Sequence, residues 1–216
     1  MARERNKAAT REAILEAART VLASGGPEAL SLSRVANLAG INRGTAYQHF
    51  GTRDELVKAS IASVGEYLSS IVFSGIEVDD EGQWIGNSER PVVEVVSRLV
   101  NFAVDNPALC RIWLFEVLSS ANPSQDPFFR QFKASTKELT KTKSSKPGID
   151  VEVLSVLMLS GYFVWPLWVE AHADSKRDRQ EMARRMRHEV VRLFLHGVLE
   201  NEEFPQLQDM LNKNLI

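Results

Sequence analysis

Apolar residues recur at the spacing of an α-helix along most of the chain. The first helix is expected from about Thr10 to Ser24, where Ile14 and Val21 fall on one face, and Gly25-Gly26-Pro27 ends it. Residues 1–7 are polar and charged, and we expect them to form a mobile basic arm. From Pro91 onward the same spacing predicts helices over about 91–105, 107–120, 126–144, 150–173 and 175–200.

The stretch from Leu30 to Leu56 carries the densest set of local signals and reads LSLSRVANLAGINRGTAYQHFGTRDEL. Ser31 is a natural N-cap, and Leu30 and Val35 stand at the two positions of a hydrophobic staple. Gly40 can adopt the positive φ that a sharp turn between two helices requires. The pattern predicts two short helices joined at an angle.

The second of these short helices presents a run of polar side chains. Asn42 is expected to cap it, while Ala46 and Phe50, four residues apart, face inward. The other positions of the run are Arg43, Gly44, Thr45, Tyr47, Gln48 and His49. This set of guanidinium, hydroxyl, phenol, amide and imidazole groups on one exposed helix is typical of a surface that contacts another molecule.

A longer fourth helix is expected from Thr52 to about Phe73, because Thr52 and Glu55 supply the T-x-x-E of a capping box. The following segment, 74–90, contains three glycines and is predicted to be a long loop in which Trp84 is covered. Its acidic cluster, 79–81, lacks the alternating ligand spacing of a calcium loop, which favours a solvated turn.

The charge is distributed unevenly along the chain. Residues 1–53 contain eight Lys or Arg and four Glu, a net charge of +4, and because the whole chain carries −2, residues 54–216 carry −6. A basic end joined to an acidic remainder suits a protein that meets phosphate groups at one end.

The run from Ser31 to Leu56 is similar to the signature of the tetracycline-repressor (TetR) family of transcription regulators. The similarity includes A-G-I in the turn, Y-Q-H-F in the second short helix, and the closing R-D-E-L. The alternative is a helical hairpin packed into an α-bundle, with Tyr47 and His49 as incidental surface aromatics. That alternative leaves the polar set on the short helix unexplained.

The resemblance implies an all-α fold of about nine helices. Residues 1–56 would form a three-helix helix-turn-helix DNA-binding domain, with the helix over about 52–73 connecting it to the rest. Residues 74–216 would form a ligand-binding and dimerisation domain. The function implied is a sequence-specific transcriptional regulator, with repression the usual outcome in the family.

The donors and acceptors of Arg43, Thr45 and Gln48 could reach base edges in the major groove. By resemblance, the phosphate contacts would come from Tyr47, His49 and Arg53, with further contacts from the preceding helix. The implied DNA-binding residues are Ser33, Arg34, Asn42, Arg43, Gly44, Thr45, Tyr47, Gln48, His49 and Arg53. Arg53 replaces the usual lysine and Ala46 a larger apolar residue, while His49 could instead serve as a cap or packing residue.

The helix expected over 150–173 is apolar around most of its circumference and needs cover on more than one side. A chain of this size has little else with which to cover it. We therefore expect a homodimer in which the helices at about 150–173 and 175–200 meet their symmetry mates as a four-helix bundle. The target would then be double-stranded DNA with a palindromic operator.

The resemblance also implies an apolar pocket that binds a small effector and changes the spacing of the two DNA-binding domains. The candidate lining residues are Phe102, Trp113, Glu116, Tyr162, Trp165 and Trp168. Aromatic residues at helical spacing are equally compatible with plain core. Glu116 stands out because a carboxylate inside an apolar run needs a partner, which a ligand, Arg111 or water could supply.

Nothing in the sequence indicates an enzyme, a cofactor or a metal site: the phosphate-loop, zinc-protease and nucleophile-elbow motifs are absent, and the four histidines are scattered. Cys110 is the only cysteine and lies in an apolar run, which fits a reducing compartment and a buried thiol. The polar first residues and the serines, glycine and proline within 153–169 favour a cytoplasmic protein without a membrane span. A DNA-binding adaptor whose body binds a protein partner is the alternative function.

Overall fold

The computed structural model describes residues 2–76, 89–141 and 145–215, and within these residues the chain is almost entirely helical. Their only β-type pairing is an isolated bridge between Ser145 and Leu199, so the predicted all-α fold is confirmed. The α-helices are α1 (Ala2–Gly25), α2 (Leu32–Leu38), α3 (Arg43–His49), α4 (Arg53–Val72), α5 (Glu89–Asp105), α6 (Pro107–Ser119), α7 (Pro127–Lys141), α8 (Val151–His172), α9 (Lys176–Gly197) and α10 (Pro205–Asn212). Three short 3-10 helices lie between them: η1 (Pro27–Ala29), η2 (Pro123–Gln125) and η3 (Asn201–Glu203).

Helix α1 begins at Ala2, so the expectation of a mobile arm over residues 1–7 is wrong for residues 2–7. The added turns are rich in Ala, Arg and Glu, which favour helix without an apolar face. The Thr10 hydroxyl donates to the Asn6 carbonyl oxygen at 2.9 Å within them. The apolar spacing that we used to place the start of the helix begins only at Ile14.

The remaining helices begin and end within a few residues of their predicted limits, except that α10 was not predicted. Its signals are Pro205 at the first helical position and Leu207 and Leu211, four residues apart, which are both buried. Most of the predicted loop over 74–90, including Trp84 and the acidic cluster 79–81, lies outside the described residues.

The backbone divides into two compact units. The first unit contains residues 1–67 and 108–121, and the second contains residues 68–107 and 122–216. Helix α6 thus groups with the N-terminal helices, whereas the sequence analysis assigned it to the C-terminal domain. The division into functional domains at residues 56 and 74 stays a prediction.

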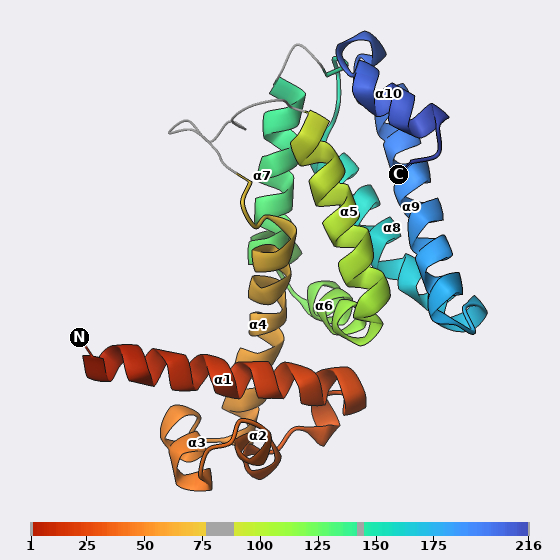
Figure 1. Ribbon diagram of the computed structural model, residues 1–216. Helices are drawn as coiled ribbons and strands as arrows, with labels where there is room; N and C mark the ends of the chain where they lie inside the picture. Colours follow the sequence, from red (N-terminus) through yellow and green to blue (C-terminus); the bar gives the residue numbers. More distant parts are fainter. Residues whose placement is uncertain (1, 77–88, 142–144, 216) are drawn as a thin grey trace. The chain divides into compact units, whose positions relative to one another are not determined.

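In the first unit, α1 packs against η1 and α2, and α2 packs against α3 (Figure 1). The apolar face predicted for α1 is buried, as are Leu30, Val35 and Phe50 from the segments that follow. Arg19 is also buried, and its guanidinium donates to Glu12 at 2.9 Å and lies 4.7 Å from the centre of the Tyr67 ring in α4.

In the second unit, α5 lies against both α8 and α9, α7 packs on α8, and α10 packs on α9 (Figure 1). Phe128 is the centre of an aromatic cluster, with its ring about 6 Å from those of Phe73, Phe132 and Phe163. The segment before α8 is joined to the end of α9, because the Lys146 amide donates to the Val198 carbonyl oxygen at 2.8 Å.

Helix α8 buries one face and leaves the opposite face exposed and apolar. The exposed residues recur at spacings of three and four and form what we call the α8 stripe: Val153, Val156, Leu157, Val164, Leu167 and Trp168. In the described part of the chain, α8 is the one helix long and apolar enough to cross a membrane by length and composition. One such helix is weak evidence of a membrane span, and the stripe shows that one face of α8 lacks an apolar partner within the described residues.

Candidate nucleic-acid interface

Helix α2 begins as its sequence predicts. Ser31 is in an extended conformation and its hydroxyl oxygen accepts from the Arg34 amide at 3.2 Å, which makes it the N-cap. Leu30 and Val35, the two staple positions, are both buried. Ser33 is half-buried and Arg34 is exposed, so α2 presents its first polar turn while its apolar face is held in the core.

Helix α2 ends in a Schellman turn centred on Gly40. The Ile41 amide donates to the Ala36 carbonyl oxygen at 3.0 Å, and the Gly40 amide donates to that of Asn37 at 3.3 Å. Gly40 has a φ of 67°, the left-handed conformation that the sequence predicted for it. These two bonds satisfy the last carbonyl groups of α2 and fix the angle at which the chain leaves it.

Helix α3 then begins at a second cap. The Asn42 side-chain oxygen accepts from the Thr45 amide at 2.8 Å and from the Thr45 hydroxyl at 3.1 Å. A Cβ atom at Gly44 would lie 3.3 Å from the same Asn42 oxygen. A side chain at position 44 would therefore crowd the cap, which is a reason for glycine there besides close approach to a ligand.

The two faces of α3 differ sharply, as predicted. Ala46 is completely buried and Phe50, directly after the helix, is 3% exposed, so both hold α3 against the rest of the first unit. The opposite face exposes Arg43, Gly44, Tyr47 and Gln48, while Thr45 and His49 are half-buried. A helix of seven residues is thus fixed by one apolar face and the Asn42 cap, and its polar face is left open.

Arg43 and Tyr47, one helical turn apart, form a pair on this open face. The Arg43 guanidinium donates to the Tyr47 hydroxyl oxygen at 3.2 Å and lies 5.3 Å from the centre of the ring. Both groups remain exposed. The ring therefore orients the guanidinium in the free protein and limits the directions in which it can point.

His49 lies near basic residues of α1 that the sequence analysis did not connect with it. Partial burial, followed by the charges of Lys7 and Arg11, lowers the pKa of His49 below its usual value. Arg11 also lies over the Phe50 ring, at 5.1 Å from its centre. Because α1 is helical from Ala2, it places Lys7 and Arg11 beside the end of α3 and enlarges the basic surface there.

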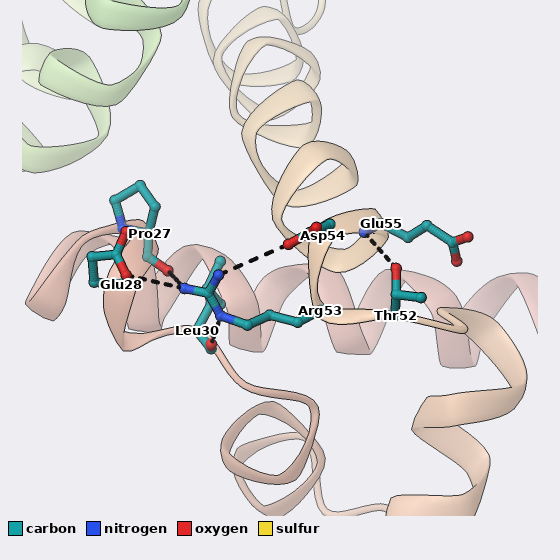
Figure 2. A network of polar contacts seen from close by, with 7 residues as sticks. All are labelled: Pro27, Glu28, Leu30, Thr52, Arg53, Asp54 and Glu55. Atoms are coloured by element: carbon teal, nitrogen blue, oxygen red, sulfur yellow. Dashed lines mark hydrogen bonds and ion pairs between the residues drawn. The ribbon is translucent and has the colours of Figure 1, made fainter.

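Arg53, at the start of α4, forms a network with the segment around η1 (Figure 2). Its Nε donates to the Leu30 carbonyl oxygen at 3.0 Å and its Nη2 to the Pro27 carbonyl oxygen, also at 3.0 Å. Glu28 lies 3.4 Å from Nη2 and Asp54 lies 4.0 Å from Nη1. The guanidinium thus joins the beginning of α4 to the segment before α2, and it remains partly exposed.

The capping box predicted at the start of α4 is only half formed. The Thr52 hydroxyl oxygen accepts from the Glu55 amide at 3.1 Å, as expected (Figure 2). The Glu55 carboxylate, however, accepts from the Gly51 amide at 2.9 Å and not from that of Thr52. The carboxylate therefore satisfies an amide one residue earlier, in the bend between α3 and α4.

The six candidate effector residues do not share one environment. Phe102 and Tyr162 are buried in the second unit, where burial raises the pKa of Tyr162, and the exposed Trp168 belongs to the α8 stripe. Trp165 is half-buried and its indole N–H donates to the Met182 carbonyl oxygen at 3.3 Å. Trp113 and Glu116 belong to the first unit.

Trp113 is buried, whereas Glu116 is exposed. The premise that Glu116 is a buried carboxylate in need of a partner is therefore wrong: it falls on the outer face of α6, beside Phe115 and Leu118, which are also exposed. Whether these six residues bind an effector stays a prediction.

Helix α2, the Schellman turn at Gly40 and the capped helix α3, with one buried and one exposed polar face, form a helix-turn-helix motif. The chain is therefore an all-α helix-turn-helix protein. Residues 14–60 match the family model described as "Bacterial regulatory proteins, tetR family". The match assigns this segment, which contains η1, α2, α3 and parts of α1 and α4, to the tetR family.

Among the curated relatives of the chain are two that match part of its length. The HTH-type transcriptional repressor Rv3405c of Mycobacterium tuberculosis is 37% identical over 67 residues, which are 31% of this chain and 36% of the relative. The HTH-type transcriptional regulator TtgR of Pseudomonas putida is 33% identical over 91 residues, which are 42% of this chain and 43% of the relative. The chain thus spans less than half the length of either relative.

Solved structures also resemble nearly the full length of the chain. The TetR family protein CprB from S. coelicolor A3(2) has a TM-score of 0.59 and 18% identity, over 95% of this chain and 97% of CprB. A gamma-butyrolactone receptor (ArpA-like protein) has a TM-score of 0.61 and 16% identity, over 97% of this chain and 98% of the receptor. At these identities the likeness shows a common fold.

The turn between α2 and α3 should depend on the backbone freedom of Gly40. No atom lies within 4 Å of a Cβ placed there, so Gly40→Ala introduces only the strain of a left-handed alanine, about 1 kcal/mol or somewhat more. Gly197→Ala is the control, because Gly197 has equally open space and ends α9 without a positive φ. Urea unfolding should show a loss of stability for the first variant alone, and equal effects would contradict the role of the turn.

The lowered pKa of His49 predicts a pH dependence. Between the folded pKa and the unfolded value of about 6.5, the unfolded chain binds more protons, so this group's contribution to stability is lost as pH falls through that window. An NMR titration should give His49 a pKa below 6.5, and Lys7→Gln should raise it. When the pH is lowered from 7.5 to 5, the free energy of unfolding measured in urea should fall more for the native chain than for His49→Gln. A titration at or above 6.5 would contradict the proximity of α1 to α3.

Proposed function

We propose that this protein is a sequence-specific, DNA-binding transcriptional regulator. The observation that supports this most strongly is the open face of α3, where Arg43, Thr45 and Gln48 present donors and acceptors of the kind that recognise base edges. This face sits on a helix whose position is fixed by Gly40, the Asn42 cap and buried Ala46. A recognition surface requires that rigidity, because a bidentate base contact tolerates little displacement.

We further propose that the surrounding groups contact phosphates. Tyr47 and His49 border the open face of α3, and Ser33 and Arg34 lie on the first turn of α2. His49 would donate a ring N–H to a phosphate oxygen. Lys7 and Arg11 of α1 join this set, because they lie close enough to His49 to lower its pKa.

The role proposed for Arg53 needs refinement. Two of its donor atoms already serve the carbonyl groups of Pro27 and Leu30 (Figure 2). Its Nη1 lies 4.0 Å from the Asp54 carboxylate, beyond a hydrogen bond, so this is the donor that a phosphate could use. We propose that Arg53 holds the start of α4 in place and offers its remaining donor to the DNA backbone.

The α8 stripe supports a homodimer through α8 and α9. Six large apolar side chains on one helix face form a surface of the kind that a second copy covers in a four-helix bundle. The exposed face of α9 adds Leu193 among charged residues. A dimer would place two copies of α3 about one turn of DNA apart, which suits a palindromic operator.

We also propose that the protein represses transcription and that a small effector releases it from DNA. The relative Rv3405c is described as a repressor, and one structural neighbour as a receptor for gamma-butyrolactone. By analogy, this chain would respond to a small apolar or amphipathic molecule, in the cytoplasm. If a library of such molecules neither stabilises the protein nor alters its DNA binding, the adaptor alternative gains weight.

Single substitutions separate base reading from phosphate binding. Arg43→Ala should reduce the preference for a selected operator over random DNA by about tenfold or more, because a base-edge contact is lost. Arg53→Ala should weaken binding to all sequences alike and reduce the salt dependence by about one ion, whereas Arg53→Lys should keep the salt dependence. Fluorescence anisotropy at several salt concentrations measures both effects, with exposed Arg130→Ala, on α7, as the control.

Two outcomes would overturn these assignments. Equal loss of specific and random binding in Arg43→Ala would exclude it from base reading. A lower melting temperature of Arg53→Ala without any change in salt dependence would show that Arg53 acts only by holding α4.

The proposed dimer predicts that a charge on the α8 stripe separates the copies. Leu157→Asp places a carboxylate in an apolar interface without a partner, at a cost of several kcal/mol. Leu215→Asp is a matched control, because Leu215 is 65% exposed against 63% for Leu157. Sedimentation should find the native chain and the control dimeric and Leu157→Asp monomeric. A monomeric native chain, or a dimeric Leu157→Asp, would contradict the use of this face.

A further inference from the structure

A groove of about 900 Å³ lies in the second unit between α5 and the first half of α9. The basic residues along it are Lys176, Arg179 and Arg187, all from α9. Asn101 and Asp105 of α5 line the other side, and buried Ala183 contributes to its apolar surface. None of the candidate effector residues lines this groove.

Arg187 is the unusual residue of the groove. It is half-buried, and its guanidinium donates to the Asn101 side-chain oxygen at 2.7 Å. Among the described residues it forms no ion pair. Burial, followed by the neighbouring charge of Arg184, lowers the pKa of Arg187 from its ordinary value. A guanidinium carries five N–H donors, and the bond to Asn101 uses only one of them, so Arg187 could also bind an anion at the groove that it lines.

Two other arginines of α9, Arg184 and Arg192, form ion pairs within the helix. Arg184 is paired with Glu181 at 2.7 Å and Arg192 with Glu189 at 2.5 Å, each with a glutamate three residues earlier. The positions three and four residues from Arg187 are occupied by Ala183, Arg184, Val190 and Val191, and none of them is acidic. Arg184 and Arg192 are thus paired along the helix, whereas Arg187, which is half-buried as they are, has no acidic residue at these positions. A partly buried charge ordinarily has a partner.

We propose that the groove between α5 and α9 binds a small organic anion, whose carboxylate or phosphate group pairs with Arg187. Lys176 and Arg179 supply further positive charge from the same face of α9, since they lie three residues apart and Arg179 lies eight residues, about two turns, before Arg187. The N-terminus of α9 does not contribute, because Ser175 and Asp178 already close it with a capping box. Asp105 and Asp174, both exposed at the groove, favour a ligand that also carries a hydroxyl or ammonium group away from its anionic end.

The site would remain open in the proposed dimer. Positions 176, 179, 183 and 187 fall on one side of α9, whereas Arg185, Glu189 and Leu193 are exposed on another. The site therefore requires neither DNA binding nor an effector in the pocket predicted from the family, and it goes beyond the proposed function. A ligand there would bridge α5 and α9.

The test uses the full chain with citrate and pyrophosphate as probes, at constant ionic strength. Binding measured by calorimetry and by the rise in melting temperature should be weakened about tenfold or more in Arg187→Gln, because a charged hydrogen-bond donor is lost. Arg179→Gln, at an exposed position, should weaken it several-fold. Arg185→Gln removes the same charge from α9 outside the groove and should bind as the native chain does.

The two probes distinguish the chemistry of the ligand, since a response to citrate alone indicates a carboxylate and one to pyrophosphate alone a phosphate. Equal binding by all four proteins would show general charge screening and overturn the proposal, as would the absence of binding to either probe. If Arg187→Gln fails to fold, the comparison of Arg179→Gln with Arg185→Gln decides the question in the same way.

Discussion

The left-handed turn at Gly40 is the constraint on which the recognition surface depends. The Schellman bonds satisfy the end of α2, and the Asn42 cap begins α3 two residues later. With both ends fixed, burial of Ala46 and Phe50 selects which face of α3 is covered. The polar face is therefore exposed as a consequence of apolar packing and backbone geometry. Thr45 also donates to the Asn42 cap, whereas the side chains of Arg43, Tyr47 and Gln48 are left for recognition.

In the second unit, too, apolar packing decides which helix faces are left exposed. Helix α8 buries Leu159, Tyr162 and Phe163 against α5 and α7 but exposes the α8 stripe. Helix α9 presents paired charges and Leu193 on one side and a half-buried Arg187 on another. Each uncovered surface has a distinct chemistry: polar on α3, apolar on α8 and cationic between α5 and α9. We assign DNA, a second copy and a small organic anion to them in that order.

Much of this could be predicted because the signals are local. The caps at Ser31 and Asn42, the turn at Gly40 and the buried positions Ala46 and Phe50 each follow from residues within one helical turn. The start of α1 could not be placed in this way, since its first turns are helical by propensity and lack an apolar face. Helix α10 has only two buried leucines as a signal, too few for a periodic pattern.

The sequence could not predict contacts between residues that lie far apart in the chain. The bonds of Arg53 with Pro27 and Leu30 span more than twenty residues, and no periodicity indicates them. The same is true of Lys7 beside His49 and of Arg187 with Asn101. Glu116 was expected to be buried because it lies in an apolar run, but it falls on the exposed side of α6. Residue types thus predicted the elements, and tertiary packing decided which side chains meet.

The central claim is that two copies of α3, held together through α8 and α9, read a paired DNA sequence. Selection of bound duplexes from a random DNA pool by the full chain tests it most directly. The account predicts enrichment of an inverted repeat whose half-sites are centred about one helical turn apart, roughly 10 base pairs or slightly more. Enrichment of a single unrepeated site, or no enrichment of any sequence, would contradict it.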